Sequence, residues 1–186
     1  MAKRRVIVVT DGDRVAQKVV EKVAQNIGGR AISFSGGNPT RISGEKIASL
    51  VKETPYDPVL VMVDDCGSRE EGNGEKALKA LASDPELEIL GVLAVASNTD
   101  AVDGVRVSAS VTRDGKIVEQ TVDKDGYPES NAEIKGDTVD VINQLSIPVV
   151  IGIGDLGKMD DADRVTDGAK ITTLAVQEIL RRNSKH

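Results

Sequence analysis

Short aliphatic runs recur along this chain, and each is followed by a turn and then by a helical pattern. In the first run, Arg5–Thr10, the four central residues Val6–Val9 are all apolar and mostly β-branched. This is typical of a parallel strand buried on both faces. Strands that alternate with helices indicate β–α–β units. The pattern predicts an α/β fold of three layers with a mainly parallel sheet.

The expected strands are rich in aliphatic residues and precede turns: Arg5–Thr10, Arg30–Phe34, Pro58–Val63, Ile89–Ala96 and Pro148–Ile153. The expected helices have apolar residues three and four positions apart: one that carries Val15, Val19 and Val23, then Gly44–Glu53, Gly72–Ala82, Asp137–Leu145 and Asp167–Arg182. Gly28 should end the first helix, because glycine readily adopts the left-handed conformation found at helix C-termini.

The region after Asp103 has a different pattern. Apolar residues alternate with polar ones from Val105 to Val111, as in a half-buried strand. Arg113–Lys116 has the composition of a tight turn, and Ile117–Val122 would form the second strand of the hairpin. We expect a β-hairpin insertion at about 103–124 that leaves the surface of a single domain, residues 1–186. A lone two-stranded ribbon is marginal in water, so it should pack on the domain, a second copy or a partner.

Composition limits the possible partners. Aromatic residues make up 2% of the 186 residues and the formal net charge is -6. Single-stranded nucleic acid is disfavoured because base stacking needs aromatic side chains, and the overall charge disfavours direct binding of nucleic acid or an anionic membrane. Cys66 is the only cysteine, so no internal disulfide can form. The apolar runs are too short to span a bilayer, so membrane association would need partners.

Polar residues follow four of the expected core strands. They are Asp11 and Asp13 after the first, Asp64 and Asp65 after the third, Ser97, Asn98, Thr99 and Asp100 after the fourth, and Asp155 with Lys158 after the last. The carboxyl ends of parallel strands share one edge, where open α/β proteins bind ligands. We therefore expect these side chains to converge on a ligand-binding edge.

A divalent cation is one candidate ligand for this edge. Asp11, Asp13, Asp64 and Asp155 would supply carboxylate oxygens, which suit Mg²⁺ or Ca²⁺, and clustered carboxylates repel one another unless a cation or a proton intervenes. The alternative is that each aspartate caps its own helix. Both readings stay open from sequence.

Two enzymatic readings also fit parts of the edge. The acids together with Lys158 are similar to the phosphorylation site of response-regulator receiver domains. In that arrangement the acids hold Mg²⁺, Asp64 accepts the phosphate, Ser97 or Thr99 contacts it and Lys158 neutralises it. However, Gly12 separates Asp11 from Asp13, where receivers have an adjacent pair. Asp11–Asp13 also resembles the Asp-x-Asp segment of topoisomerase–primase (Toprim) domains, but no earlier strand supplies the glutamate that Toprim catalysis needs. A Toprim-like or flavodoxin-like sheet is expected in either case.

Six segments, in order, resemble the hydrophilic stage V sporulation protein AE family. They are Val6–Asp13, Gly36–Ile47, Asp57–Asp65, Leu90–Thr99, Gly136–Val139 and Val149–Lys158. They are spread from Val6 to Lys158, and the resemblance as a whole covers nearly the full chain. The parts that match least well are Gly67–Gly74 and Asp100–Lys135. No single segment is specific, but the collinear set is.

The resemblance implies a protein of spore-forming bacteria that acts in sporulation and germination. It implies work with other stage V sporulation A proteins, including the AD subunit, in dipicolinic acid transport. It also implies a place in the spore at the periphery of the inner membrane, held there through partners, with the isolated chain soluble. The family supplies no catalytic residues. We therefore expect a non-enzymatic accessory subunit, with homo-oligomerisation open and a Mg²⁺-dependent phosphotransfer or Toprim-like enzyme as the alternative.

Overall fold

Seven strands form the main sheet of the computed structural model, which describes residues 2–68, 70–98 and 103–185. In spatial order they are β2 (Arg30–Ala31), β3 (Val59–Met62), β1 (Arg4–Val9), β4 (Leu87–Val95), β9 (Val150–Ile153), β6 (Ala109–Val111) and β7 (Ile117–Val118). All neighbouring pairs are parallel except β6 and β7. The mainly parallel sheet is therefore confirmed.

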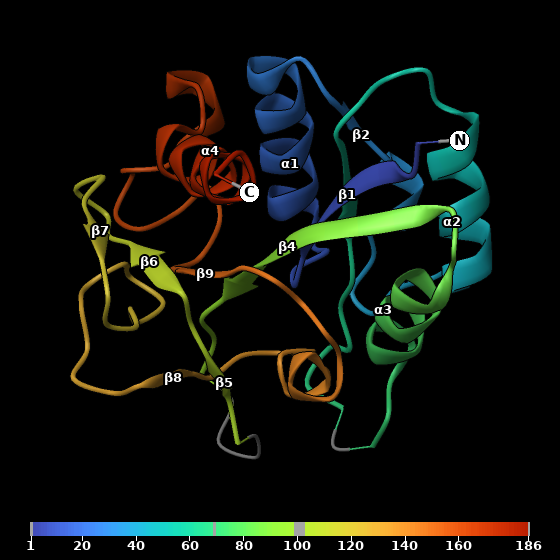
Figure 1. Ribbon diagram of the computed structural model, residues 1–186. Helices are drawn as coiled ribbons and strands as arrows, with labels where there is room; N and C mark the ends of the chain where they lie inside the picture. Colours follow the sequence, from blue (N-terminus) through green and yellow to red (C-terminus); the bar gives the residue numbers. More distant parts are fainter. Residues whose placement is uncertain (1, 69, 99–102, 186) are drawn as a thin grey trace.

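Helices cover both faces of this sheet (Figure 1). Helices α1 (Arg14–Ile27) and α4 (Lys170–Asn183) lie on one face, and α2 (Gly44–Glu53) and α3 (Asn73–Ser83) lie on the other. Alternate strand residues serve the two cores, so that in β1 Ile7 packs toward α1 and α4 while Val8 packs toward α2 and α3. The expected three-layer α/β fold is confirmed.

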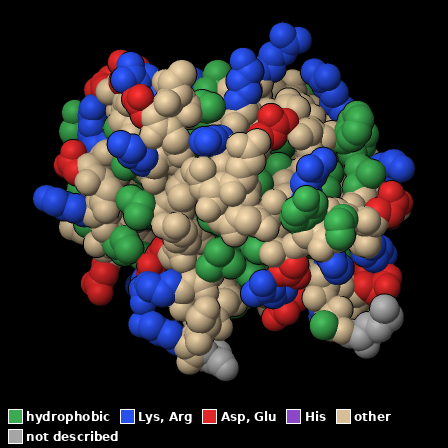
Figure 2. All heavy atoms as spheres, turned by 90° about the horizontal axis from the view of Figure 1, so that it is seen from above, with side chains coloured by type: hydrophobic (Ala, Val, Ile, Leu, Met, Phe, Trp, Pro, Cys, Tyr) green, Lys and Arg blue, Asp and Glu red, His purple; other side chains and the backbone are tan. Residues whose placement is uncertain are grey.

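The outer surface of the α1–α4 layer faces water. Figure 2 looks onto this side and shows Lys and Arg side chains spread over it, with hydrophobic side chains in small separate groups. Arg14 and Lys18 of α1 and Arg181 of α4 are exposed. The two helices thus have the amphipathic pattern of a layer that covers one core.

The first helix begins and ends as its sequence predicts. The Asp13 side chain accepts a hydrogen bond from the backbone N–H of Ala16 at 2.8 Å, which is an N-cap contact. Gly28 follows the helix in the left-handed conformation with φ of 72°. These local contacts fix α1 directly after β1 and hold the Asp11–Asp13 loop at the end of the sheet.

The strand order begins 2-3-1-4, because β3 inserts between β2 and β1. A flavodoxin-like sheet has the order 2-1-3-4-5, in which strand 1 neighbours strand 2. The flavodoxin-like option is therefore not the observed topology: α1 carries the chain past the position of β3 and places β2 at the edge.

The strand expected at Arg30–Phe34 is shorter than predicted. It covers Arg30–Ala31 and is followed by a 3₁₀ helix at Ser33–Ser35. Ser35 explains the change, because its Oγ donates to the carbonyl of Ile32 at 2.5 Å and accepts from the N–H of Met62 at 2.9 Å. The Ser35 hydroxyl thereby accepts from the Met62 N–H, a donor that a longer β2 would otherwise use, and the hydrogen bonding between β2 and β3 ends.

The helix expected at Asp137–Leu145 was also wrong in type and extent. A 3₁₀ helix covers Asp140–Gln144, and Thr138 before it has a left-handed φ of 64° that prevents an earlier start. The last helix begins at Lys170 rather than Asp167, because a 3₁₀ helix at Val165–Asp167 precedes it and ends at left-handed Gly168.

The hairpin turn expected at Arg113–Lys116 is present, but the insertion does not leave the domain. β6 and β7 pair across it with Ser110 opposite Val118, and β6 also pairs in parallel with β9. The preceding β5 (Val105–Arg106) pairs with β8 (Glu133–Ile134) in a second, two-stranded sheet. The free side of β9 offers backbone partners, so the ribbon extends the main sheet instead of projecting from it.

In the part of the chain that the structure describes, no helix is long and apolar enough to cross a membrane.

Candidate functional site

The loops that follow β1, β3 and β9 meet at the carboxyl edge of the main sheet. Asp11 lies close enough to Asp13, Asp64 and Asp155 for their negative charges to raise its pKa. The fold therefore brings together four aspartates that come from three separate loops, as parallel topology predicts.

Asp64 joins two of these loops through backbone hydrogen bonds. It is 3% exposed, and its two carboxylate oxygens accept from the N–H of Gly12 at 3.1 Å and from the N–H of Cys66 at 2.8 Å. Its own N–H donates to Thr40 Oγ1 at 2.8 Å. The side chain that sequence offered as a metal ligand or phosphate acceptor is thus engaged with backbone donors.

Gly12 sits where no side chain fits. A Cβ built on it would lie 2.4 Å from the carbonyl oxygen of Gly37, and Gly37 donates its N–H to the carbonyl of Gly12 at 2.7 Å. The Asp-Gly-Asp segment is therefore required by the close approach of the 36–40 loop. This packing accounts for Gly12 without reference to catalysis.

Asp65, the neighbour of Asp64, holds the start of α3. Its Oδ1 accepts from the N–H groups of Gly74 at 2.6 Å and Glu75 at 3.3 Å, and its Oδ2 accepts from Thr138 Oγ1 at 2.8 Å. A carboxylate at a helix N-terminus satisfies free donors and is favoured by the helix dipole. The adjacent Asp64–Asp65 pair was visible in sequence, but Thr138, a distant partner, carried no sequence signal.

Two carboxyl groups at this edge titrate near neutral pH. The pKa of Asp11 is raised from 3.8 to about 7, first by burial and then by the Asp13 charge, with smaller contributions from Asp64 and Asp155. The pKa of Asp64 is raised to about 6, again first by burial, while its hydrogen bonds from Cys66 and Gly12 oppose the shift. Carboxyl groups with such values can exchange protons at physiological pH.

Two further acids, not singled out from sequence, share this environment. Burial raises the pKa of Asp137, and the charge of Asp65 adds to the effect while a hydrogen bond from the Gly67 N–H opposes it. Burial and the Asp65 charge also raise the pKa of Glu75. The acidic edge is therefore wider than the four expected aspartates.

The remaining expected residues lie further along the edge. Lys158 approaches Asp155 with 3.5 Å between Nζ and Oδ2, which is a weak and partly exposed ion pair. Ser97, which donates its N–H to the carbonyl of Lys135 at 3.0 Å, and Asn98 line a polar hollow of about 220 Å³. Thr99 and Asp100 lie outside the described residues.

The carboxylates do not form a ready-made cation site. Among the described residues, no three His, Cys, Asp or Glu side chains are arranged so that they could hold a metal ion. Asp13 and Asp64 direct carboxylate oxygens at backbone N–H groups instead. The Mg²⁺ or Ca²⁺ site expected on Asp11, Asp13, Asp64 and Asp155 stays a prediction, which calorimetric titration of wild type and of the Asp11→Asn plus Asp64→Asn variant can test.

A family of known proteins matches nearly the whole chain. The sequence profile of a family described as stage V sporulation protein AE1 matches residues 5–183. No curated protein and no solved structure matches the chain.

Proposed function

This chain belongs to the stage V sporulation protein AE1 family, and from that membership we propose that it is an accessory subunit of the dipicolinic acid transport machinery of spores. In this role it acts in sporulation and germination by associating with other stage V sporulation A proteins, the AD subunit among them. It is held at the inner membrane of the spore through those partners, and it performs no chemical step itself.

The use made of the edge carboxylates supports a non-enzymatic role. Asp13 caps α1, Asp64 accepts from two loop amides, and Asp65 accepts from the first amides of α3 and from Thr138. These hydrogen bonds fix the loops of the edge relative to one another. A rigid, loop-built surface suits protein recognition, since little ordering is needed on binding.

Co-purification from spores tests the proposal. An affinity-tagged chain, expressed in place of the native protein in a spore-forming host, should recover the other stage V A proteins from detergent-solubilised spore membranes. Deletion of the gene should also lower the dipicolinic acid content of the spores. If the tagged chain recovers none of these proteins and the deletion leaves the dipicolinic acid content unchanged, the proposal is wrong.

The raised pKa values of Asp11 and Asp64 favour a second candidate, a Mg²⁺-dependent phosphotransfer or Toprim-like enzyme. Groups that titrate near neutral pH in a cluster of acids are frequent at catalytic sites. A phosphatase and phosphotransfer assay with Mg²⁺ separates the two functions. Turnover by wild type that is lost in Asp64→Asn, with folding retained, would establish the enzyme.

A further inference from the structure

The β2 edge of the main sheet is open. β2 pairs with β3 on one side, where Arg30 N–H donates to the carbonyl of Pro58 at 3.1 Å and Ile32 N–H to that of Leu60 at 2.9 Å. Backbone groups alternate in direction along a strand, so the N–H and C=O of Ala31 point away from β3. No strand in the described part of the chain pairs with that outer side. Such an edge is a template for pairing with another strand.

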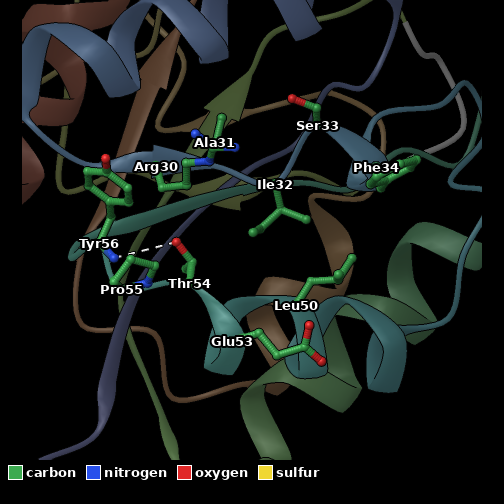
Figure 3. Close-up of a pocket in the computed structure, with 10 residues that line it drawn as sticks. All are labelled: Arg30, Ala31, Ile32, Ser33, Phe34, Leu50, Glu53, Thr54, Pro55 and Tyr56. Carbon is green, nitrogen blue, oxygen red and sulfur yellow. Dashed lines mark hydrogen bonds between the residues drawn. The ribbon is translucent and has the colours of Figure 1, made fainter.

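A groove of about 440 Å³ runs beside this open edge (Figure 3). Ile32 and Leu50 lie along its middle, between the β2 segment and the end of α2. Tyr56 lies at one end together with Arg30, whose guanidinium carbon is 6.0 Å from the centre of the Tyr56 ring, and Phe34 lies at the other end. The groove is therefore apolar along its middle and aromatic at both ends.

The two aromatic side chains at the ends of the groove are exposed. Phe34, the only phenylalanine, is 77% exposed, and Tyr56, one of two tyrosines, is 49% exposed. Large aromatic side chains bury more apolar area than any others and are enriched at protein interfaces. Two of the three aromatic residues of this chain thus lie around one groove beside an open sheet edge, while the third, Tyr127, packs against the guanidinium of Arg113. This placement favours a protein interface at the β2 edge.

The charges at the groove are self-complementary. Arg30 and Glu53 are its charged lining residues, one of each sign, on opposite walls formed by β2 and α2. An occupant with one strong charge would meet repulsion from one of them. A surface with the same pair, rotated by a two-fold axis, would place each cation near an anion.

We propose that the β2 edge binds a second copy of this chain, with the two β2 strands antiparallel about Ala31. The outward N–H and C=O of Ala31 then pair with the same groups of the second copy and join the two main sheets. Because Phe34 and Tyr56 lie at opposite ends of the groove, the antiparallel arrangement brings Phe34 of each copy toward Tyr56 of the other. It also carries Arg30 across the groove of the other copy, toward Glu53. This association does not depend on the transport role.

Sedimentation velocity of the full chain over a concentration series tests the dimer. Wild type should show a reversible monomer–dimer equilibrium. Phe34→Ser should raise its dissociation constant by at least about tenfold, because a two-fold dimer loses this aromatic contact twice. Ile117→Ser is the control, because Ile117 is another exposed large apolar residue but lies in β7, the opposite edge strand. Ile117→Ser should leave the equilibrium unchanged.

A charge exchange tests the orientation. Arg30→Glu and Glu53→Arg should each weaken the dimer, and the double variant should restore it, since only a two-fold pairing regains both contacts. Circular dichroism confirms that each variant is folded. If the wild type stays monomeric at all concentrations, the proposal is wrong, and the groove would instead suit an extended segment of another protein. A double variant as weak as the single ones, or an Ile117→Ser effect equal to that of Phe34→Ser, also overturns it.

Discussion

Asp64 accepts a hydrogen bond from the backbone N–H of Gly12, with 3.1 Å between Oδ2 and the amide nitrogen. The bond ties the loop after β3 to the loop after β1, and the other carboxylate oxygen holds the N–H of Cys66. Asp64 therefore clamps the carboxyl edge of the sheet. Its burial and its two hydrogen bonds from backbone N–H groups hold these loops in place.

Asp64→Ala should destabilise the fold. The change leaves the N–H groups of Gly12 and Cys66 without their acceptor, and a buried unpaired donor costs about 1–3 kcal/mol. Urea unfolding at about pH 5, below the Asp64 pKa of about 6, measures this loss with little offset from the removal of a buried charge. Glu119→Ala, at an exposed position, should change the free energy of unfolding by less than about 0.5 kcal/mol. If both variants lost the same free energy of unfolding, the proposed role of Asp64 in holding the two loops together would be wrong.

Thr138→Val should also destabilise the fold. Valine keeps the shape of the side chain but removes the 2.8 Å hydrogen bond to Asp65 Oδ2, and the buried carboxylate loses a partner worth about 1–3 kcal/mol. The left-handed backbone at Thr138 is equally unfavourable for both β-branched residues, so it cancels in the comparison. Thr166→Val, at an exposed site, is the matched control. Thermal unfolding that shifts equally for both variants would show that the Asp65 contact contributes nothing.

The elements that sequence predicted well are those determined by local pattern. β1, β3, β4 and β9 each contain at least four consecutive buried residues, nearly all of them aliphatic. Helix α1 has a capping aspartate and a terminal glycine. The parallel alternation then places the aspartates of three loops at one edge. The convergence of Asp11, Asp64 and Asp155 follows from topology alone, which is why it could be predicted.

The features that sequence missed depend on contacts between distant residues. β2 ends early because Ser35 bonds to Met62 in another strand. β6 joins the main sheet because β9, far along the chain, has a free side. The partner of Asp65 is Thr138, which lies 73 positions further along the chain. Propensity and periodicity describe neighbours in sequence, so they contain no information on these pairings.

The stability of the protein should fall as the pH rises from about 5 to about 8. The folded-state pKa values of Asp11 and Asp64, about 7 and about 6, lie above the ordinary value of 3.8. In this window the native state binds more protons than the unfolded state, so the free energy of unfolding decreases with pH, by up to about 1.4 kcal/mol per pH unit for each excess proton. Ion pairs lower the pKa values of three other carboxyl groups, Glu71, Asp84 and Glu178. These groups make the free energy of unfolding increase with pH, but only at pH values below this window. Urea unfolding in steps across the window measures the slope, and a flat or rising profile would contradict it.

Asp11→Asn should reduce this pH dependence and stabilise the protein at the alkaline end. Asparagine keeps the Oδ1 that accepts from the Asp13 N–H at 3.3 Å, but it carries no charge to be buried beside Asp13, Asp64 and Asp155. At about pH 5 wild-type Asp11 is mostly protonated, so the variant and the wild type should differ little in stability. At about pH 8 Asp11 is ionised in the wild type, and its burial and its repulsion by the neighbouring carboxylates destabilise the native state. The variant should therefore be more stable at this pH by at least about 1 kcal/mol. Asp161→Asn, an exposed aspartate with a left-handed backbone that asparagine tolerates, should leave the slope unchanged. If the stability of the Asp11→Asn variant depended on pH as steeply as that of wild type, the extra proton bound by the native state would belong to another group. The assignment of the raised pKa to Asp11 would then be wrong.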